Sequence, residues 1–409
     1  MGVSKLRLKK QPYYLIAFRI LLVLVWTQET VLRFFKAIFE RLPIIGGLSD
    51  VIIPIAIIAA LIVSLPWFFR KLKGTDLLFY LFMVVLVLGT MAIYDNNASY
   101  LREEWWRILV ASATFYFLGV AHSHRACSRD LFWCSAIGVA AVFLYQIYKL
   151  SRGRVLEEDD MNTAYNLLPS VMYLFYYASY KKKRILWCIA GGATAVMFVF
   201  GTRGPIVCII VYLCALIMNN TLRSQRKGRK ILVGVLLLGV ILLFSNESVF
   251  IAISHFMSGI FRMVGFSTRI FDFFLAGEIT VSKGRDILQE QIIYYIKENP
   301  IVGYGFTGDR HLIGVYCHNL VLELWSHFGV IAGSLVLLAL FTLTIIALIK
   351  CSKNEKVFKF ALMLACLVFA KLMMSNSYAI EPYFFFMIGA YVGILRRFVK
   401  RKPKKEEDL

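Results

Sequence analysis

Apolar runs of about 20 residues recur along the whole chain of 409 residues and restrict its fold more than any other feature. A run of this length is what a helix needs to cross the hydrocarbon core of a bilayer. Hydrophobic residues make up 59% of the chain, charged residues make up 17%, and the mean hydropathy is +0.69. A soluble domain carries roughly 25% charged residues. The sequence therefore predicts an all-α polytopic membrane protein that forms a single integral membrane domain over residues 1–409.

We expect about twelve transmembrane helices, the tenth with a re-entrant or interfacial start. The expected spans are 12–28, 50–69, 76–94, 107–121, 131–148, 163–180, 185–201, 205–218, 231–244, 316–349, 356–374 and 379–395.

The distribution of charge explains the net charge of +21. Of the 46 Lys and Arg residues, 29 lie in one set of alternate connections, which includes a basic tail at 396–409, and 15 lie in the other set. Because cytoplasmic connections carry the excess of basic residues, we expect both termini to be cytoplasmic. The basic residues then face anionic lipid headgroups, and no nucleic-acid partner is expected.

A loop over 245–316 is the longest connection on the expected extracytoplasmic side. Such a loop among short ones usually carries function. Within it, 284–299 is predicted to form an amphipathic helix, because Leu288, Ile292 and Ile296 recur four residues apart on one face. We expect this helix to lie at the outer surface of the membrane.

Three polar residues on the expected outer face are candidates for chemistry. Arg203 lies in a tight turn between two apolar runs, Arg285 begins the amphipathic helix, and His318 opens the tenth span. Two permanently charged arginines suit a phosphate or pyrophosphate, and a neutral histidine can take a proton from a hydroxyl near neutral pH. This combination suits glycosyl transfer from a sugar on a lipid pyrophosphate. The acidic run 157–160 is interpreted as a solvated loop, so we expect neither a metal nor a cofactor.

Each of the three residues also has a structural interpretation. Arg203 suits an interfacial side chain that reaches for lipid headgroups, Arg285 a solvated loop charge, and His318 a packed histidine. All three lie on one expected face, however, and ionisable groups within or beside a membrane tend to be functional.

Four segments occur in order along the chain, namely GTRG at 201–204, GRDILQEQ at 284–291, ENPIVGYGF at 298–306 and HNLVLELWSHFGVIAG at 318–333. This ordered set resembles the O-antigen ligase and O-antigen polymerase family of polytopic membrane glycosyltransferases. The resemblance covers roughly residues 160 to 395.

The resemblance implies a metal-independent, GT-C-like membrane fold that acts on undecaprenyl-pyrophosphate-linked glycans. It places the protein in the bacterial cytoplasmic (inner) membrane, with its active site on the extracytoplasmic face. It also implies that Arg203 and Arg285 bind the pyrophosphate and that His318 is the catalytic base. Candidate sugar or orienting contacts are Asn319, Asn162, Asn166 and Tyr304. Tyr316 stands where pilin-glycosylating relatives often have a second histidine, which disfavours a protein acceptor.

The function expected first is polymerisation of the repeat units of a capsule or O-antigen. The motifs leave open a ligase that transfers the finished glycan to lipid A core or another anchor. The expected partners are the lipid-linked glycan donor, a glycan acceptor and membrane lipids, together with flippase and chain-length regulator proteins.

A lipid-linked sugar flippase or other transporter is the alternative from another class. Transporters place charges near the bilayer midplane and show paired repeats with broken helices. The basic residues inside the expected spans are Arg19 and Lys371, and no repeat is visible. Lys371 is interpreted as a structural residue that snorkels to the outer interface.

Overall fold

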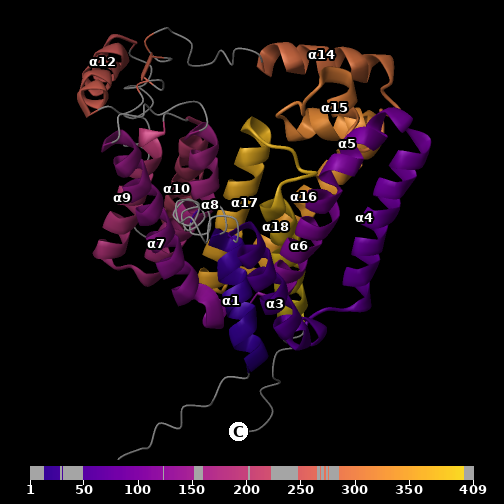
Figure 1. The fold of residues 1–409 in the computed structure, drawn as a ribbon, viewed down its shortest axis with the longest axis horizontal. Coiled ribbons are helices and arrows are strands. Elements are labelled where there is room, and N and C mark those ends of the chain that lie inside the picture. Colours follow the sequence, from indigo (N-terminus) through magenta and orange to yellow (C-terminus); the bar gives the residue numbers. More distant parts are fainter. Residues whose placement is uncertain are drawn as a thin grey trace, which may run out of the picture.

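The computed structural model of the chain describes residues 13–27, 30, 49–122, 124–151, 160–200, 203–222, 247–264, 268, 271–272, 275 and 285–399. All regular secondary structure in these ranges is helical, and most helices run side by side in a bundle (Figure 1). The class expected from the sequence, an all-α membrane protein, agrees with this architecture.

The helices are α1 (Tyr13–Thr27), α3 (Ser49–Phe69), α4 (Gly74–Ile93), α5 (Asp95–Trp105), the π-helix η3 (Trp106–Ala111), α6 (Ser112–Ala121), α7 (His124–Ser151), α8 (Asp160–Lys181), α9 (Arg184–Val199), α10 (Arg203–Leu222), α12 (Glu247–Val264), α14 (Arg285–Glu298), α15 (Gly308–Ile313), α16 (Leu320–Cys351), α17 (Glu355–Met374) and α18 (Pro382–Val399). Each expected span overlaps one of these helices except 231–244, which lies outside the described residues.

Within the described part of the chain, five helical segments are long and apolar enough to cross a membrane. They are Gly74–Ile93, Ser128–Tyr148, Gly204–Thr221, Leu320–Cys351 and Glu355–Met374. Apolar helices of membrane length are what a multi-pass membrane protein requires.

The helices α6 and α18 meet backbone to backbone in the core of the bundle. A Cβ atom on Gly389 would lie 2.1 Å from the carbonyl oxygen of Tyr116, and one on Gly119 would lie 2.3 Å from that of Phe386. Because these positions carry no side chain, the two helices approach closely, as small residues allow for helix pairs in membranes.

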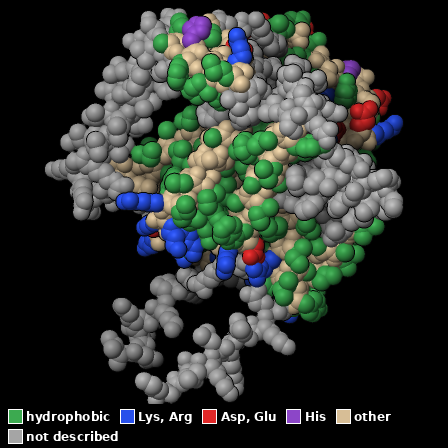
Figure 2. Space-filling model, turned by 60° about the vertical axis from the view of Figure 1, so that its left-hand side comes forward, with side chains coloured by type: hydrophobic (Ala, Val, Ile, Leu, Met, Phe, Trp, Pro, Cys, Tyr) green, Lys and Arg blue, Asp and Glu red, His purple; other side chains and the backbone are tan. Residues whose placement is uncertain are grey.

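Among the described residues, the Lys and Arg side chains of the connections at 70–73, 181–184 and 350–356 gather at one end of the bundle, the basic end (Figure 1). There Arg396 of α18 pairs with the buried Asp76 of α4 at 2.7 Å, and Lys359 of α17 donates to the carbonyl oxygen of Ser179 on α8 at 2.8 Å. Figure 2 shows Lys and Arg side chains along the lower edge of an apolar surface. The helices α14 and α15 lie at the opposite end, the distal end (Figure 1).

The amphipathic helix expected over 284–299 is present as α14. Its buried residues are Ile292 and Ile296, which pack in one cluster with Cys317. The helix lies across the distal end of the bundle rather than along it (Figure 1). The face with the four-residue spacing is therefore the face that attaches α14 to the protein.

The helix α16 is broken at Gly329, where φ is 78° and ψ is 166°. The indole nitrogen of Trp325 donates to the hydroxyl of Ser334 at 3.0 Å, although nine residues of an unbroken helix span about 13.5 Å. The first arm, 320–328, therefore folds back against the second arm, 330–351. The second arm is still about 33 Å long, enough to cross a bilayer.

The segment 300–305 closes this break with its backbone. The N–H of Tyr304 donates to the carbonyl of Ser326 at 2.8 Å. The N–H of Gly305 donates to the carbonyl of His327 at 3.0 Å. Carbonyls at a helix end have no partner within the helix, and unpaired backbone groups are costly at membrane depth. The tenth expected span thus begins with a folded-back arm, which the GYG motif caps. Its re-entrant or interfacial position in the membrane stays a prediction.

We predict that Gly329→Ala destabilises the protein. A Cβ atom there would lie 2.0 Å from the carbonyl oxygen of Ile301, at a φ that side chains rarely adopt. The free energy of unfolding should fall by roughly 2 kcal/mol or more, measured by thermal unfolding in detergent. Gly192→Ala on α9 is the control, because a Cβ there meets nothing within 4 Å. Equal unfolding temperatures for the two variants would contradict the role of the break.

Candidate functional site

The three residues that the sequence singles out all lie at element boundaries near the distal end. Arg285 is the first residue of α14, Arg203 is the first residue of α10, and His318 stands two residues before α16. The side chain of Arg203 lies outside the described part of the structure, so only its backbone is placed.

The imidazole of His318 has one nitrogen held by the backbone. Its Nδ1 lies 3.2 Å from the carbonyl oxygen of Ser375. A carbonyl can only accept a hydrogen bond, so Nδ1 carries the proton in this contact. The neutral tautomer then keeps the lone pair on Nε2, the nitrogen that a base uses.

Arg285 is held by the neighbouring peptide group. Its guanidinium donates to the carbonyl oxygen of Met374, the last residue of α17. The carbonyls of Met374 and Ser375 are consecutive along the chain, so they hold Arg285 and His318 beside each other. A helix C-terminus favours positive charge, which suits the guanidinium.

Tyr165 of α8 connects this pair to α10. Its hydroxyl interacts with the side chain of Ser375 and with the guanidinium of Arg285. The same hydroxyl lies so close to α10 that a Cβ atom on Gly204 would be 1.9 Å from it. The backbone of Arg203 is therefore adjacent to the group formed by Arg285 and Tyr165.

Sequence reasoning missed Tyr165 while selecting both asparagines beside it. Asn162 is exposed and Asn166 is half-buried, both in the first turns of α8. The one indication of Tyr165 was Gly204 of the TRG motif, which has no side chain and so leaves room for the tyrosine hydroxyl. A tyrosine near the start of a largely apolar helix offers no such signal by itself.

The remaining predicted contacts serve the backbone of the site. The side-chain oxygen of Asn319 accepts hydrogen bonds from the N–H groups of Val321 at 3.0 Å and Leu322 at 3.3 Å. It therefore caps the first arm of α16 directly after His318. The hydroxyl of Tyr304 donates to the carbonyl of Tyr295 at 2.9 Å, so its ring attaches the 300–305 segment to α14.

The electrostatics around His318 favour its neutral form. Burial lowers the pKa of His318 below the ordinary value of 6.5, and the positive charge of Arg285 lowers it further. The ring of Tyr316 packs on the imidazole with 4.3 Å between centroids. At pH 7 the imidazole is therefore neutral and able to take a proton.

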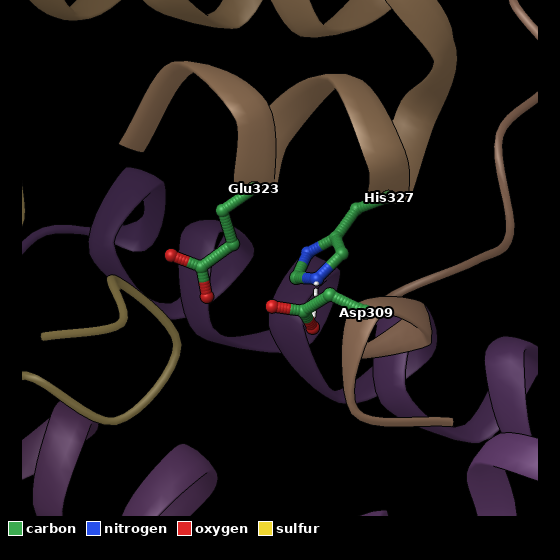
Figure 3. A group of neighbouring side chains, drawn as sticks. All are labelled: Asp309, Glu323 and His327. Carbon is green, nitrogen blue, oxygen red and sulfur yellow. Dashed lines mark hydrogen bonds and ion pairs between the residues drawn. The ribbon is translucent and has the colours of Figure 1, made fainter. Parts of the chain in front are cut away.

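A second polar group lies behind this site. Asp309 from α15 faces Glu323 and His327, which project from successive turns of the first arm of α16 (Figure 3). The ligand atoms of these three residues all lie within 4.8 Å of one another, so the group could hold a metal ion. A cation is already present there, because the guanidinium of Arg310 lies 2.6 Å from Asp309 and 3.3 Å from Glu323. A metal ion would have to displace it.

Lys371 does not snorkel to the interface. It is buried, and its Nζ lies 2.6 Å from Oε2 of the buried Glu381. The snorkelling interpretation from the sequence is therefore wrong, because a buried carboxylate offers the ammonium group a partner inside the protein.

Comparison with models of known protein families gives no match, and neither does comparison with curated proteins. The chemistry of this site and the four resembling segments are therefore the features that bear on function.

We predict that His318 titrates below pH 6.5 and that Arg285→Gln raises its pKa. Removal of the neighbouring positive charge relieves the repulsion of the imidazolium form. NMR of histidine-labelled protein in detergent measures both values, with His318→Gln to assign the signal. A pKa of 6.5 or above in the unaltered protein contradicts the described surroundings of the imidazole.

Proposed function

We propose that the protein is a membrane glycosyltransferase that polymerises undecaprenyl-pyrophosphate-linked oligosaccharide repeat units of a surface polysaccharide. The observation that carries the proposal is the meeting of His318 and Arg285 on two consecutive carbonyls. Tyr165 joins this pair to the start of α10, where Arg203 lies. A base thus stands beside permanent positive charge, at the end of the bundle opposite the basic connections.

The proposed reaction begins with the acceptor sugar hydroxyl. Its proton passes to Nε2 of His318 as its oxygen forms a bond to the anomeric carbon of the donor. The bond from that carbon to the pyrophosphate oxygen breaks, and the lipid pyrophosphate leaves. Arg285 and Arg203 stabilise the negative charge that develops on it, as preorganised cations do in other transfers.

The positive ends of two helix dipoles add to this stabilisation. Arg285 and Arg203 are the first residues of α14 and α10, and free N–H groups at helix N-termini attract anions. These groups supply positive charge without a metal ion. The proposal therefore includes metal independence.

The proposal includes the membrane topology. The basic end faces the cytoplasm together with both termini, and the distal end faces the opposite side of a bacterial inner membrane. The twelve spans and the GT-C-like architecture belong to this proposal, supported by the helices at the expected ranges and by the basic residues at one end.

We predict that His318→Ala, Arg285→Gln and Arg203→Gln each lower the rate of glycan elongation by on the order of 10²-fold or more. The assay uses purified protein in liposomes with lipid-linked repeat units extracted from cells that lack the protein. Lys297→Gln is the control, since Lys297 is an exposed residue of α14. Full elongation by all three variants contradicts the assigned site.

The products in cells separate the polymerase from its alternatives. Loss of a polymerase leaves single capped repeat units, whereas loss of a ligase leaves long chains on the carrier. A transporter moves the lipid-linked sugar without elongating it. The broken helix α16 is also a feature of transporters. Lys371, which pairs with the buried Glu381, lies in the last turn of α17 rather than at its middle.

We predict that elongation survives treatment with EDTA, because arginines and helix N-termini supply the positive charge. The measurement is the liposome assay before and after dialysis against the chelator. If EDTA abolishes elongation and a divalent cation restores it, metal independence is contradicted. Asp309, Glu323 and His327 would then be the candidate metal ligands.

A further inference from the structure

The connection between α17 and α18 begins with Ser375, whose carbonyl holds His318. It directly follows Met374, whose carbonyl holds Arg285. Met374 ends α17, and Ser375 already departs from helical geometry with φ −156° and ψ −11°. The N–H of Ser375 makes the last helical hydrogen bond, to the carbonyl of Lys371 at 2.9 Å. Contacts other than the α17 helix must therefore hold the connection after Ser375.

Two buried charged side chains hold the connection at Ser377. The guanidinium of Arg310 donates to the hydroxyl of Ser377 at 2.5 Å, and that hydroxyl donates to the carboxylate of Glu323. Glu323 also accepts the backbone N–H of Tyr378 at 3.2 Å. Ser377 and Glu323 have no exposed surface, so these contacts are protected from water.

Asp309 ties the segment before His318 to the same group. Its Oδ2 accepts the N–H of Cys317 at 3.2 Å, and its Oδ1 lies 2.8 Å from Nε2 of His327. The other ring nitrogen of His327 lies 2.7 Å from the hydroxyl of Tyr378. The backbone beside His318 and the backbone beside its carbonyl partner are thus joined by one hydrogen-bonded network.

We propose that this clamp network positions His318 and Arg285 for the reaction. It consists of Asp309, Arg310, Glu323, His327, Ser377 and Tyr378. Its members touch neither sugar nor pyrophosphate in this assignment and act through the peptides at 317 and 374–378. The inference rests on the proposed function, because it assigns the network to the same site.

The cost of burying charges favours a role of the clamp network in positioning His318 and Arg285 over a role in stabilising the fold alone. Burying charged groups costs several kcal/mol per ion, and well-packed apolar residues often stabilise a protein as much as an ion cluster does. Catalysis, in contrast, depends on holding groups within about 0.5 Å of the productive geometry. His318 also has a positive φ of 55°, which a residue other than glycine keeps only where its surroundings enforce it.

The test compares Glu323→Leu and Ser377→Ala with the conservative Glu323→Gln in the liposome assay. We expect the first two to lower kcat about 10-fold or more while KM for the lipid-linked repeat unit stays within about twofold. Glu323→Gln should retain more of kcat than Glu323→Leu, because its amide oxygen can still accept from Ser377 and Tyr378. Ser334→Ala is the control, since its hydroxyl bonds Trp325 and no member of the network.

Hydrogen exchange gives a readout that does not require activity. Peptides covering 374–381 should exchange faster in Glu323→Leu and Ser377→Ala than in the unaltered protein or in Ser334→Ala, because the network no longer holds the connection. If Glu323→Leu does not fold, the test depends on Ser377→Ala, which removes only one hydroxyl and leaves the buried charges in place.

The outcomes separate the two proposals. If the unaltered protein does not elongate repeat units, the proposed function fails. The network is then tested by the rate of hydrogen exchange at 374–381 and by the NMR signal of His318 in the variants. If the unaltered protein is active, unchanged kcat in Ser377→Ala and Glu323→Leu overturns the positioning role. A rise in KM with unchanged kcat also overturns it, because that result indicates a binding role.

Discussion

The break in α16 leaves backbone carbonyls without helical partners, and the distal end of the molecule is built around satisfying them. The N–H groups of Tyr304 and Gly305 donate hydrogen bonds to the carbonyl oxygens of Ser326 and His327. Asn97 of α5 in turn donates to the carbonyl of Tyr304 at 2.8 Å. Buried backbone groups need partners inside the protein, so the 300–305 segment has to stay in place. That requirement sets the path of the chain from α14 to the first arm of α16.

The folded-back arm gives the protein a short buried helix whose N-terminus carries the candidate base. Asn319 starts this arm, and Glu323 and His327 project from it into a polar interior. A continuous membrane helix would expose these side chains to lipid or to apolar neighbours at high cost. The break therefore lets charged side chains lie in the interior of the protein. There they contact Ser377 and Tyr378, which follow the carbonyls that hold Arg285 and His318.

Sequence patterns predicted the parts of the fold that depend on near neighbours. The apolar runs indicated the helices, and the spacing of Ile292 and Ile296 indicated the attached face of α14. Arg285 and His318 were recognisable because charged or titratable groups are rare beside apolar runs. Tyr165 was not recognisable, since a tyrosine suits an apolar helix and only its approach to Gly204 distinguishes it. Lys371 was misinterpreted because its partner Glu381 lies on another element.

By itself, the sequence determined the class of the protein, the amphipathic helix and the chemical types of residue available at the site. Hydropathy and helical period are properties of a few consecutive turns, so they can be seen without the fold. The tertiary structure alone decided which nitrogen of His318 is protonated, where α16 reverses and which carboxylates share Arg310. Those outcomes depend on hydrogen bonds between segments far apart in the chain, and buried polar groups take whichever partners the packing of the helices brings to them.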